Sequence, residues 1–302
     1  MLHRKKYYLI AMFFLVFVSL YGFSEARDPS YIGDYEQRVT LYGKMYQNLL
    51  ELSIEGNDDL SYNANNPAGL GVGISCRDYR LSLEFCHDIG VTADKEYPKT
   101  QIFDLQVHKY TDHFIFDILF QQYKGFYRDD GTTLFTYPGL SLFLTGVTGQ
   151  YVFNSKYFSS RAAYALTEKQ LKSAGTFLLG SSFYYYSVNT DEIHDDILHS
   201  VQGFQCGVNA GYAYNWVVRK KWLINLSLSI GVDINNSSID TFFDHNLRIA
   251  PLVLPKFSCS YNKESWSLGM VFIANTITAI MEEDADLELD SGRLNVVFLK
   301  RL

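Results

Sequence analysis

Residues 101–127 alternate between large apolar and polar side chains along two consecutive segments. Alternation with a period of two is the pattern of a β-strand whose two faces meet different surroundings. The apolar face carries Phe103, Leu105, Val107, Phe114, Phe116, Ile118 and Phe120. The opposite face carries Asp104, Gln106, His108, Tyr110, His113, Asp117, Gln121 and Tyr123. We interpret this stretch as a hairpin in a wall that separates lipid from a polar lumen.

A turn at residues 111–112 would place both polar sets on one side of the hairpin. With a two-residue turn, Gln106 pairs with Asp117 and Asp104 pairs with Leu119. The turn and the alternation therefore agree on which side chains face the lumen.

The N-terminus predicts export. Basic residues at positions 3–6 precede an apolar run of 14 residues, Tyr8–Tyr21, and Ser24-Glu25-Ala26 offers a cleavage site. The run is shorter than the roughly 20 residues that a membrane helix needs. We expect a signal peptide at residues 1–26, Sec-dependent export with cleavage near Ala26, a periplasmic lead-in at 27–40 and a barrel at 41–302.

The composition of the exported chain fits a membrane barrel. Loss of residues 1–26 removes three basic residues and one acidic residue, so the formal charge falls from −7 to −9. An acidic chain lacks the basic footprint that nucleic-acid binding needs. No later stretch has 18 apolar residues without a charge, yet aromatic residues make up 16% of the chain. Many aromatics without an apolar helix are typical of a transmembrane β-barrel.

The same alternation predicts an all-β, antiparallel transmembrane barrel of twelve strands. The expected strands lie near residues 41–54, 69–76, 79–86, 101–110, 113–123, 139–153, 175–187, 204–216, 222–233, 247–261, 265–272 and 293–302. The register of the first, sixth and seventh strands stays open, because their alternation is poor.

The connections between these strands divide into short and long ones. Short connections fall near 77–79, 111–112, 217–221 and 262–264, and long ones near 55–67, 87–100, 124–138, 189–202, 235–246 and 278–291. Outer-membrane barrels have short periplasmic turns and long external loops. Aromatic residues beside the short turns predict a girdle at that interface, formed by Tyr110, Phe114, Trp216, Trp222, Tyr261 and Trp266.

One connection departs from this pattern, because an inserted segment at 154–174 stands where a short turn is due. It would be either a periplasmic ornament or a plug inside the lumen. As a plug, its charged residues Arg161, Glu168, Lys169 and Lys172 would pair with the wall carboxylates Glu84, Asp104, Asp117 and Asp233.

The four cysteines do not suggest disulfide bonds. A turn at 78–79 places Cys76 opposite Leu81 and Cys86 opposite Gly71. This separates the two thiols beyond the roughly 7 Å between Cα atoms that a bridge allows. The cysteine spacing fits no zinc site.

Three stretches resemble a known family: NNPAGLGVGIS at 65–75, FDLQVHKY to QQYKGFYRDD at 103–130, and YVFNSKYFSSRAAYALTEKQLKSAGTFLLG at 151–180. The chain is similar along nearly its whole mature length to the family called domain of unknown function 4421, outer-membrane-type barrels of Gram-negative bacteria. The resemblance implies a fold and a location, and no reaction. The chain departs from the usual barrel pattern at its end, where Leu302 replaces the terminal aromatic residue.

Several residues are candidates for chemistry. His108 and Asp117 would lie diagonally across one strand pair, and a histidine beside a carboxylate is part of a hydrolase triad. His194 and His199 in the acidic loop 191–199 are candidate metal ligands. The motif Tyr123-Lys124-Gly125-Phe126-Tyr127 would grip a sugar or lipid headgroup, or simply form the outer girdle.

We therefore expect an outer-membrane barrel that acts as a plugged or narrow pore or as a surface scaffold. The alternatives are a lipid-acting hydrolase built on His108 and Asp117, and an adhesin that uses its acidic loops at 191–196 and 282–286. The expected partners are outer-membrane lipid, lipopolysaccharide and the barrel-insertion machinery, with no nucleic acid and no cofactor. The ligand stays open.

Overall fold

The computed structural model describes residues 27–302 except 56–59, 67, 77–80, 89–96, 191–199, 237–247 and 281–285. The predicted signal peptide lies outside the described residues, as do the acidic loops with His194 and His199. The elements are β1 (Ile32–Asp34), β2 (Val39–Glu55), β3 (Leu60–Asn63), β4 (Ala68–Cys76), β5 (Leu81–Asp88), β6 (Gln101–Tyr110), β7 (Phe114–Asp129), β8 (Leu134–Val152), the π-helix η1 (Arg161–Ala165), β9 (Glu168–Gln170), β10 (Ala174–Asn189), β11 (Val201–Val218), β12 (Trp222–Asn236), β13 (Arg248–Asn262), β14 (Trp266–Ile280) and β15 (Asp286–Arg301). In this part of the chain, no helix is long and apolar enough to span a membrane.

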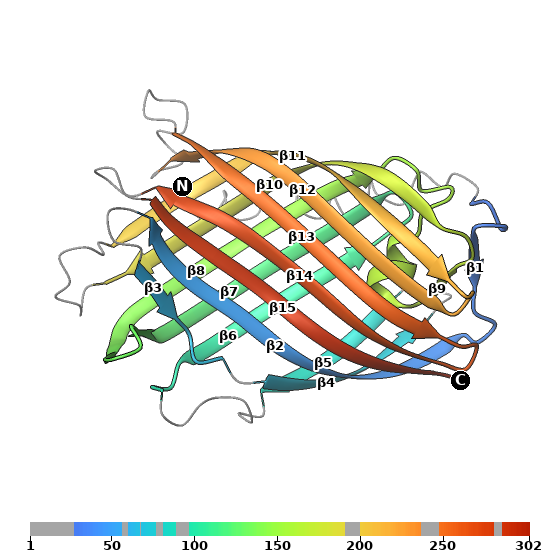
Figure 1. Cartoon of the computed structure of the whole chain (residues 1–302), viewed down its shortest axis with the longest axis horizontal. Helices are drawn as coiled ribbons and strands as arrows, with labels where there is room; N and C mark the ends of the chain where they lie inside the picture. Colours follow the sequence, from blue (N-terminus) through green and yellow to red (C-terminus); the bar gives the residue numbers. More distant parts are fainter. Residues whose placement is uncertain are drawn as a thin grey trace, which may run out of the picture.

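The long strands form a closed antiparallel barrel (Figure 1). Ladders run from β15 through β14, β13, β12, β11, β10, β8 and β7 to β3 and β2, and β2 pairs again with β15. The β3–β7 contact joins Asn63 and Tyr127. β4 and β5 continue from β2, and β6 lies on β7. The prediction of an antiparallel barrel is confirmed, while the described ladders close a ring of ten strands with further strands attached.

Several strands continue beyond the predicted ends. β7 and β8 reach Asp129 and Leu134, so the long loop predicted at 124–138 is wrong. β3 likewise lies inside the predicted loop 55–67, and β14 and β15 extend into the predicted loop 278–291. A transmembrane strand needs only about 9–11 residues. Beyond the lipid the apolar signal ends, but the backbone ladder continues.

The hairpin register differs from the prediction by two residues. His108 pairs with Asp117 and Gln106 with Leu119, because the two-residue turn is formed by Asp112 and His113, one position later than predicted. The amide of Thr111 donates to the carbonyl of Phe114 at 2.8 Å. A shift of two residues keeps every side chain on its predicted face, and it places His108 directly opposite Asp117 rather than diagonal to it.

The predicted register around the first two cysteines is confirmed. Cys76 pairs with Leu81, and Gly71 pairs with Cys86. Cys76, Cys206 and Cys259 are free thiols.

Large apolar side chains face outward, as predicted. On β12, Leu226, Leu228 and Ile230 are 54%, 51% and 63% exposed, while the alternate residues Asn225 and Ser227 are buried. Tryptophans and tyrosines gather at the short-turn end, where Trp222 and Tyr261 have ring centroids 5.1 Å apart. This is the surface that lipid requires, and it confirms the orientation of the wall.

The interior is not uniformly polar, which corrects the predicted polar lumen. On β8 and β10, whose register the sequence left open, large apolar residues point inward as well as outward. Leu140, Leu142, Tyr184 and Tyr186 are buried inside. They belong to a dry layer at the loop end of the barrel, which we call the loop-end layer. It comprises Leu50, Leu52, Ile54, Tyr62, Ala64, Leu119, Tyr123, Phe126, Leu140, Leu142, Leu144, Tyr184, Tyr186, Val188, Leu252, Leu254, Ile277, Leu287 and Leu289.

The inserted segment closes the opposite end. Residues 153–173, here called the plug, lie at the short-turn end of the barrel together with β1 and the C-terminus (Figure 1). Phe158, Ala163 and Tyr164 pack on Val271 and Ile273 of the wall. β1 pairs with β9, so the predicted lead-in is part of this closure. The insertion is therefore a plug rather than a periplasmic ornament.

Candidate functional site

The centre of the barrel holds an ion pair that crosses the lumen. The carboxylate of Asp117 on β7 lies 2.5 Å from Nζ of Lys256 on β13. Its other oxygen lies 2.7 Å from Nδ1 of His108 on β6. β7 and β13 stand on opposite sides of the ring. Because Lys256 is only 2% exposed, this contact ties the two walls together across a dry interior.

A second polar group lies next to it around Asp104. This carboxylate accepts hydrogen bonds from Tyr123 Oη at 2.7 Å and Gln121 Nε2 at 3.0 Å. Arg293 on β15 approaches it at 3.2 Å. Arg293 also donates to Asn48 Oδ1 at 2.7 Å, so its charge is held from two strands.

A third group consists of neutral donors and one carboxylate. Gln150 Nε2 donates to Asn209 at 2.9 Å and to Ser229 at 2.8 Å. Ser182 Oγ donates to both oxygens of Asp233, at 3.0 and 3.2 Å. Together the three groups form a polar layer between the loop-end layer and the plug, and most of its side chains are buried.

The plug is pinned by a charge network at its outer side. Arg161 Nε and Arg27 Nη1 each lie 2.6 Å from Oε1 of Glu168. Both arginines also bind Asp112 in the turn after β6. Ser159 Oγ donates to the second oxygen of Glu168 at 2.7 Å. Burial raises the pKa of Glu168, and the Arg27 guanidinium opposes this.

Wall residues hold the plug from the inside. Asn215 Nδ2 donates to the carbonyl of Ser159 at 3.1 Å, and Arg301 Nη2 donates to the carbonyl of Leu166 at 2.8 Å. Leu166 follows η1 with a φ of 57°, a left-handed conformation that turns the chain back toward β9. Lys256 lies 5.8 Å from the ring centroid of Tyr164, and burial raises the pKa of that phenol. The plug thus contacts the cross-lumen ion pair.

The predicted ion pairs of the plug with Asp104, Asp117 and Asp233 are wrong. Arg161 and Glu168 pair with each other. Lys169 pairs with Glu264 at 2.7 Å, and Lys172 lies 3.3 Å from Ser30 Oγ. Among the wall carboxylates whose side chains the structure describes, Asp117 pairs with Lys256, Asp104 lies beside Arg293, and Asp233 accepts from Ser182.

The remaining predicted residues divide between the interior and the rim. Gln106 faces inward and donates to Asp104 at 3.3 Å. A bulge between Lys124 and Phe126 splits the aromatic motif. Tyr123 and Phe126 are buried inside, while Lys124 is exposed.

Glu84, His194 and His199 cannot be placed as site residues. Glu84 lies on β5 opposite Gly73, and its side chain is outside the described part. His194 and His199 are outside the described residues altogether.

Two histidines near the lumen each form one of the side-chain pairs that occur in a hydrolase triad. His108 and Asp117 are hydrogen-bonded, but among the described residues no hydroxyl donates to or accepts from His108. Ser155 Oγ and His113 Nδ1 are 2.9 Å apart, and both residues are buried, Ser155 as part of the plug itself. The side chain of His108 is 23% exposed, whereas His113 and Ser155 are buried.

Sequence reasoning missed Lys256 and Arg293, which neutralise the central carboxylates. On β13, Lys256 alternates with outward residues in the same way as the inward-facing Ser258 and Ser260, and this alternation could have identified it as an inward residue. Pro251 and Pro255 obscured the strand pattern in the sequence. The partner of Lys256 is 139 residues away in sequence, and only barrel closure identifies it.

A closed antiparallel barrel with an apolar outer wall and a filled interior defines the class: this is the fold of an outer-membrane β-barrel, here with an occluded lumen. The family model described as "Domain of unknown function (DUF4421)" matches residues 26–298, and the chain belongs to this family.

Similarities to solved structures are remote. A bacterial polysaccharide outer membrane secretin has 10% identity and a TM-score of 0.37, over 89% of this chain and 100% of that chain. The outer membrane protease OmpT from Escherichia coli has 7% identity and a TM-score of 0.35, over 89% of this chain and 98% of that chain. The P. putida toluene transporter TodX has 7% identity and a TM-score of 0.26, over 88% of this chain and 90% of that chain. No curated protein matches the sequence.

Proposed function

We propose that this protein is a non-conducting outer-membrane barrel that serves as a scaffold in the membrane. The observation that carries the proposal is the filled interior: the loop-end layer, the polar layer and the plug follow one another along the lumen. The loop-end layer is built from the wall strands themselves, so it does not leave with the plug. The partners of such a scaffold would be outer-membrane lipid and lipopolysaccharide, reached after Sec export, removal of residues 1–26 and insertion by the barrel machinery.

We further propose that twelve strands span the membrane. β3 and β4 pair with successive parts of β2, so they form two segments of one strand. β5 and β6 would then be the neighbouring strands that complete the wall. An even number of strands is the rule for single-chain bacterial barrels.

Planar-bilayer conductance tests the scaffold role. The wild-type protein and a variant lacking residues 156–173 are inserted, and folding is verified by heat-modifiable electrophoretic mobility. We expect neither protein to conduct, because the loop-end layer still seals the barrel. A second variant adds Tyr184→Ala, Tyr186→Ala, Leu252→Ala and Lys256→Ala to the deletion. It opens the loop-end layer and removes the side chain that crosses the polar layer, so it should conduct. Conductance after deletion of the plug alone would show a plugged pore instead.

The hydrogen bond between His108 and Asp117 keeps a lipid-acting hydrolase as the second candidate. Phospholipid turnover by the purified barrel in mixed micelles tests it. His108→Ala must abolish turnover for the hydrolase to stand, and Gln106→Ala, at the neighbouring inward position on β6, serves as the matched control. A chain without turnover leaves the scaffold as the better proposal.

A further inference from the structure

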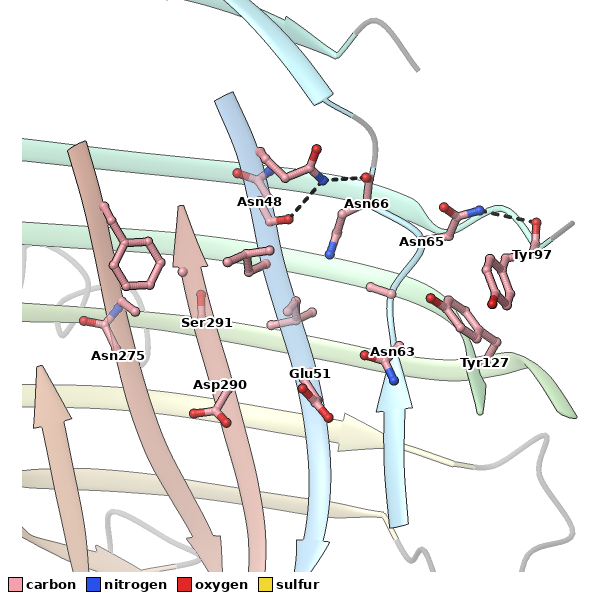
Figure 2. A pocket seen from close by; sticks show the side chains of 17 residues that line it. Asn48, Glu51, Asn63, Asn65, Asn66, Tyr97, Tyr127, Asn275, Asp290 and Ser291 are labelled. Atoms are coloured by element: carbon pink, nitrogen blue, oxygen red, sulfur yellow. Dashed lines mark hydrogen bonds between the residues drawn. The ribbon is translucent and has the colours of Figure 1, made fainter. Parts of the chain in front are cut away.

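A groove of about 530 Å³ runs along the outer wall near the loop end. Figure 2 shows that its side chains come from β14, β15, β2 and β3, with Tyr97 and Tyr127 at one end. Ala274 pairs with Gly292, and Gly292 pairs with Leu49. Ala274 and Gly292 stand at outward positions where the wall elsewhere carries large side chains. These two small residues therefore form the floor of the groove. Its volume falls within the range of small-molecule sites, roughly 300–1,000 Å³.

The height of the groove along the barrel places it at the outer membrane interface. On β14, Trp266 belongs to the aromatic girdle and Thr276 pairs with Asp290 of the groove. Ten residues separate Trp266 from Thr276. At about 3.3 Å per residue and a tilt of about 40°, they rise roughly 25 Å, the height of the apolar band. Asp290 therefore lies where the lipid tails end, while the floor at Ala274 and Gly292 lies two residues further toward the lipid.

The lining of the groove is rich in amides and carboxylates. Gln47, Asn63 and Asn66 are side-chain amides that contribute to it. Oδ1 of Asn66 is buried and has no hydrogen-bond partner among the described residues. A buried acceptor without a donor is unfavourable.

Two carboxylates face each other across the groove. Glu51 and Asp290 are direct partners in the β2–β15 register. Thr276 Oγ1 donates to Asp290 at 2.6 Å, and Ser61 Oγ donates to Glu51. Like charges directly opposite each other on a sheet are destabilising. Donor groups between them, such as sugar hydroxyls, would relieve this repulsion.

The far end of the groove is aromatic. The rings of Tyr97 and Tyr127 are stacked with centroids 4.3 Å apart and an interplanar angle of 19°. Tyr97 Oη donates to Asp129 at 2.9 Å, which fixes this pair. Tyr127 belongs to the aromatic motif identified in the sequence, and the bulge turns it outward.

We propose that this groove binds the sugar portion of a cell-surface glycan. Amides and carboxylates offer paired donors and acceptors to vicinal hydroxyl groups, and a tyrosine face packs on a sugar ring. Phosphate groups are disfavoured because both charged side chains are acidic. The sugar can come from a membrane glycolipid or from a free oligosaccharide.

Binding to the full chain in nanodiscs tests the proposal with three probes. They are rough-type lipopolysaccharide, the core oligosaccharide released from it, and lipid A without core sugars, each titrated calorimetrically. Binding of the lipopolysaccharide or of the free core oligosaccharide, with no binding of lipid A, is expected. Binding of the free oligosaccharide identifies a soluble glycan as sufficient, while binding of the intact glycolipid alone identifies a membrane-anchored one.

Two variants connect the binding to this groove. Ala274→Leu fills the floor and should weaken binding at least tenfold, whereas Ala210→Leu, the same change on the outer face of β11, should not. Asn63→Ala should also weaken binding at least tenfold. Equal affinity for lipid A, or unchanged affinity in both groove variants, overturns the proposal. The proposal is also overturned if chelation of divalent cations abolishes binding while Asn63→Ala leaves it intact. A cation held by Glu51 and Asp290 would then be responsible for the binding. These results are independent of conductance.

Discussion

The cross-lumen contact between Lys256 and Asp117 makes a sharp prediction about stability. Lys256→Met keeps the length and the apolar stem of the side chain and removes its charge. Asp117 then stays buried with His108 as its remaining partner. Removal of one partner of a buried ion pair costs about 3–5 kcal/mol. We expect a loss near the lower end, about 3 kcal/mol, because His108 still stabilises one carboxylate oxygen.

Reversible urea unfolding from lipid vesicles measures this loss. The three tryptophans of the chain report the transfer from lipid to water. Lys221→Met, at an exposed turn, is the matched control and should change the free energy of unfolding by less than about 0.5 kcal/mol. Adding Asp117→Asn to Lys256→Met removes the unpaired charge and should recover about 1 kcal/mol or more. A single variant that loses less than about 1 kcal/mol, or a double variant that recovers nothing, would refute a dry, walled interior.

Three further changes test the plug, the outer wall and the close packing around Gly69. Asp112→Asn weakens the charge-assisted hydrogen bonds from Arg27 and Arg161, each worth about 1.5–3 kcal/mol. Because the plug is then held less firmly, trypsin should cleave within it at least tenfold faster, as followed by mass spectrometry. An unchanged cleavage rate would contradict the charge network. Leu228→Arg puts a charge into the lipid-facing centre of β12 and should cost about 2–4 kcal/mol in vesicle unfolding, so a neutral result would mean that this face does not meet acyl tails. Gly69→Ala places a methyl group 1.9 Å from the Tyr46 ring and should cost about 1–3 kcal/mol, whereas Gly43→Ala has open space and should be silent; similar values for both would exclude overpacking as the cause.

The hairpin at 101–127 illustrates how far local sequence carries the fold. Its polar and apolar faces are assigned correctly although the predicted register is off by two residues. Faces depend on parity, which a shift of two preserves, whereas register depends on the turn. The same limit explains the strand ends, because alternation records where lipid lies and not where the ladder stops.

The interior was harder to predict, because a large apolar residue gives the same sequence pattern whether its side chain faces lipid or the lumen. Leu142 and Tyr184 belong to a dry layer that no single strand reveals. The predicted partners of Arg161 were wrong for a related reason. Its carboxylate partners, Asp112 and Glu168, lie in a turn and in the plug itself, and a pairing argument based on wall positions does not consider them. The groove likewise depends on small residues from neighbouring strands, which become a floor only when the strands are paired.

The sequence by itself determined that this chain makes a barrel wall and which side chains meet lipid, because strand faces are set by residues two positions apart. Only the tertiary structure decided what fills the barrel. Ring closure brings Lys256 to a carboxylate 139 residues away, folds the plug into one end and packs wall leucines into the other. Contacts of this kind depend on the size and closure of the ring, and no local pattern encodes either.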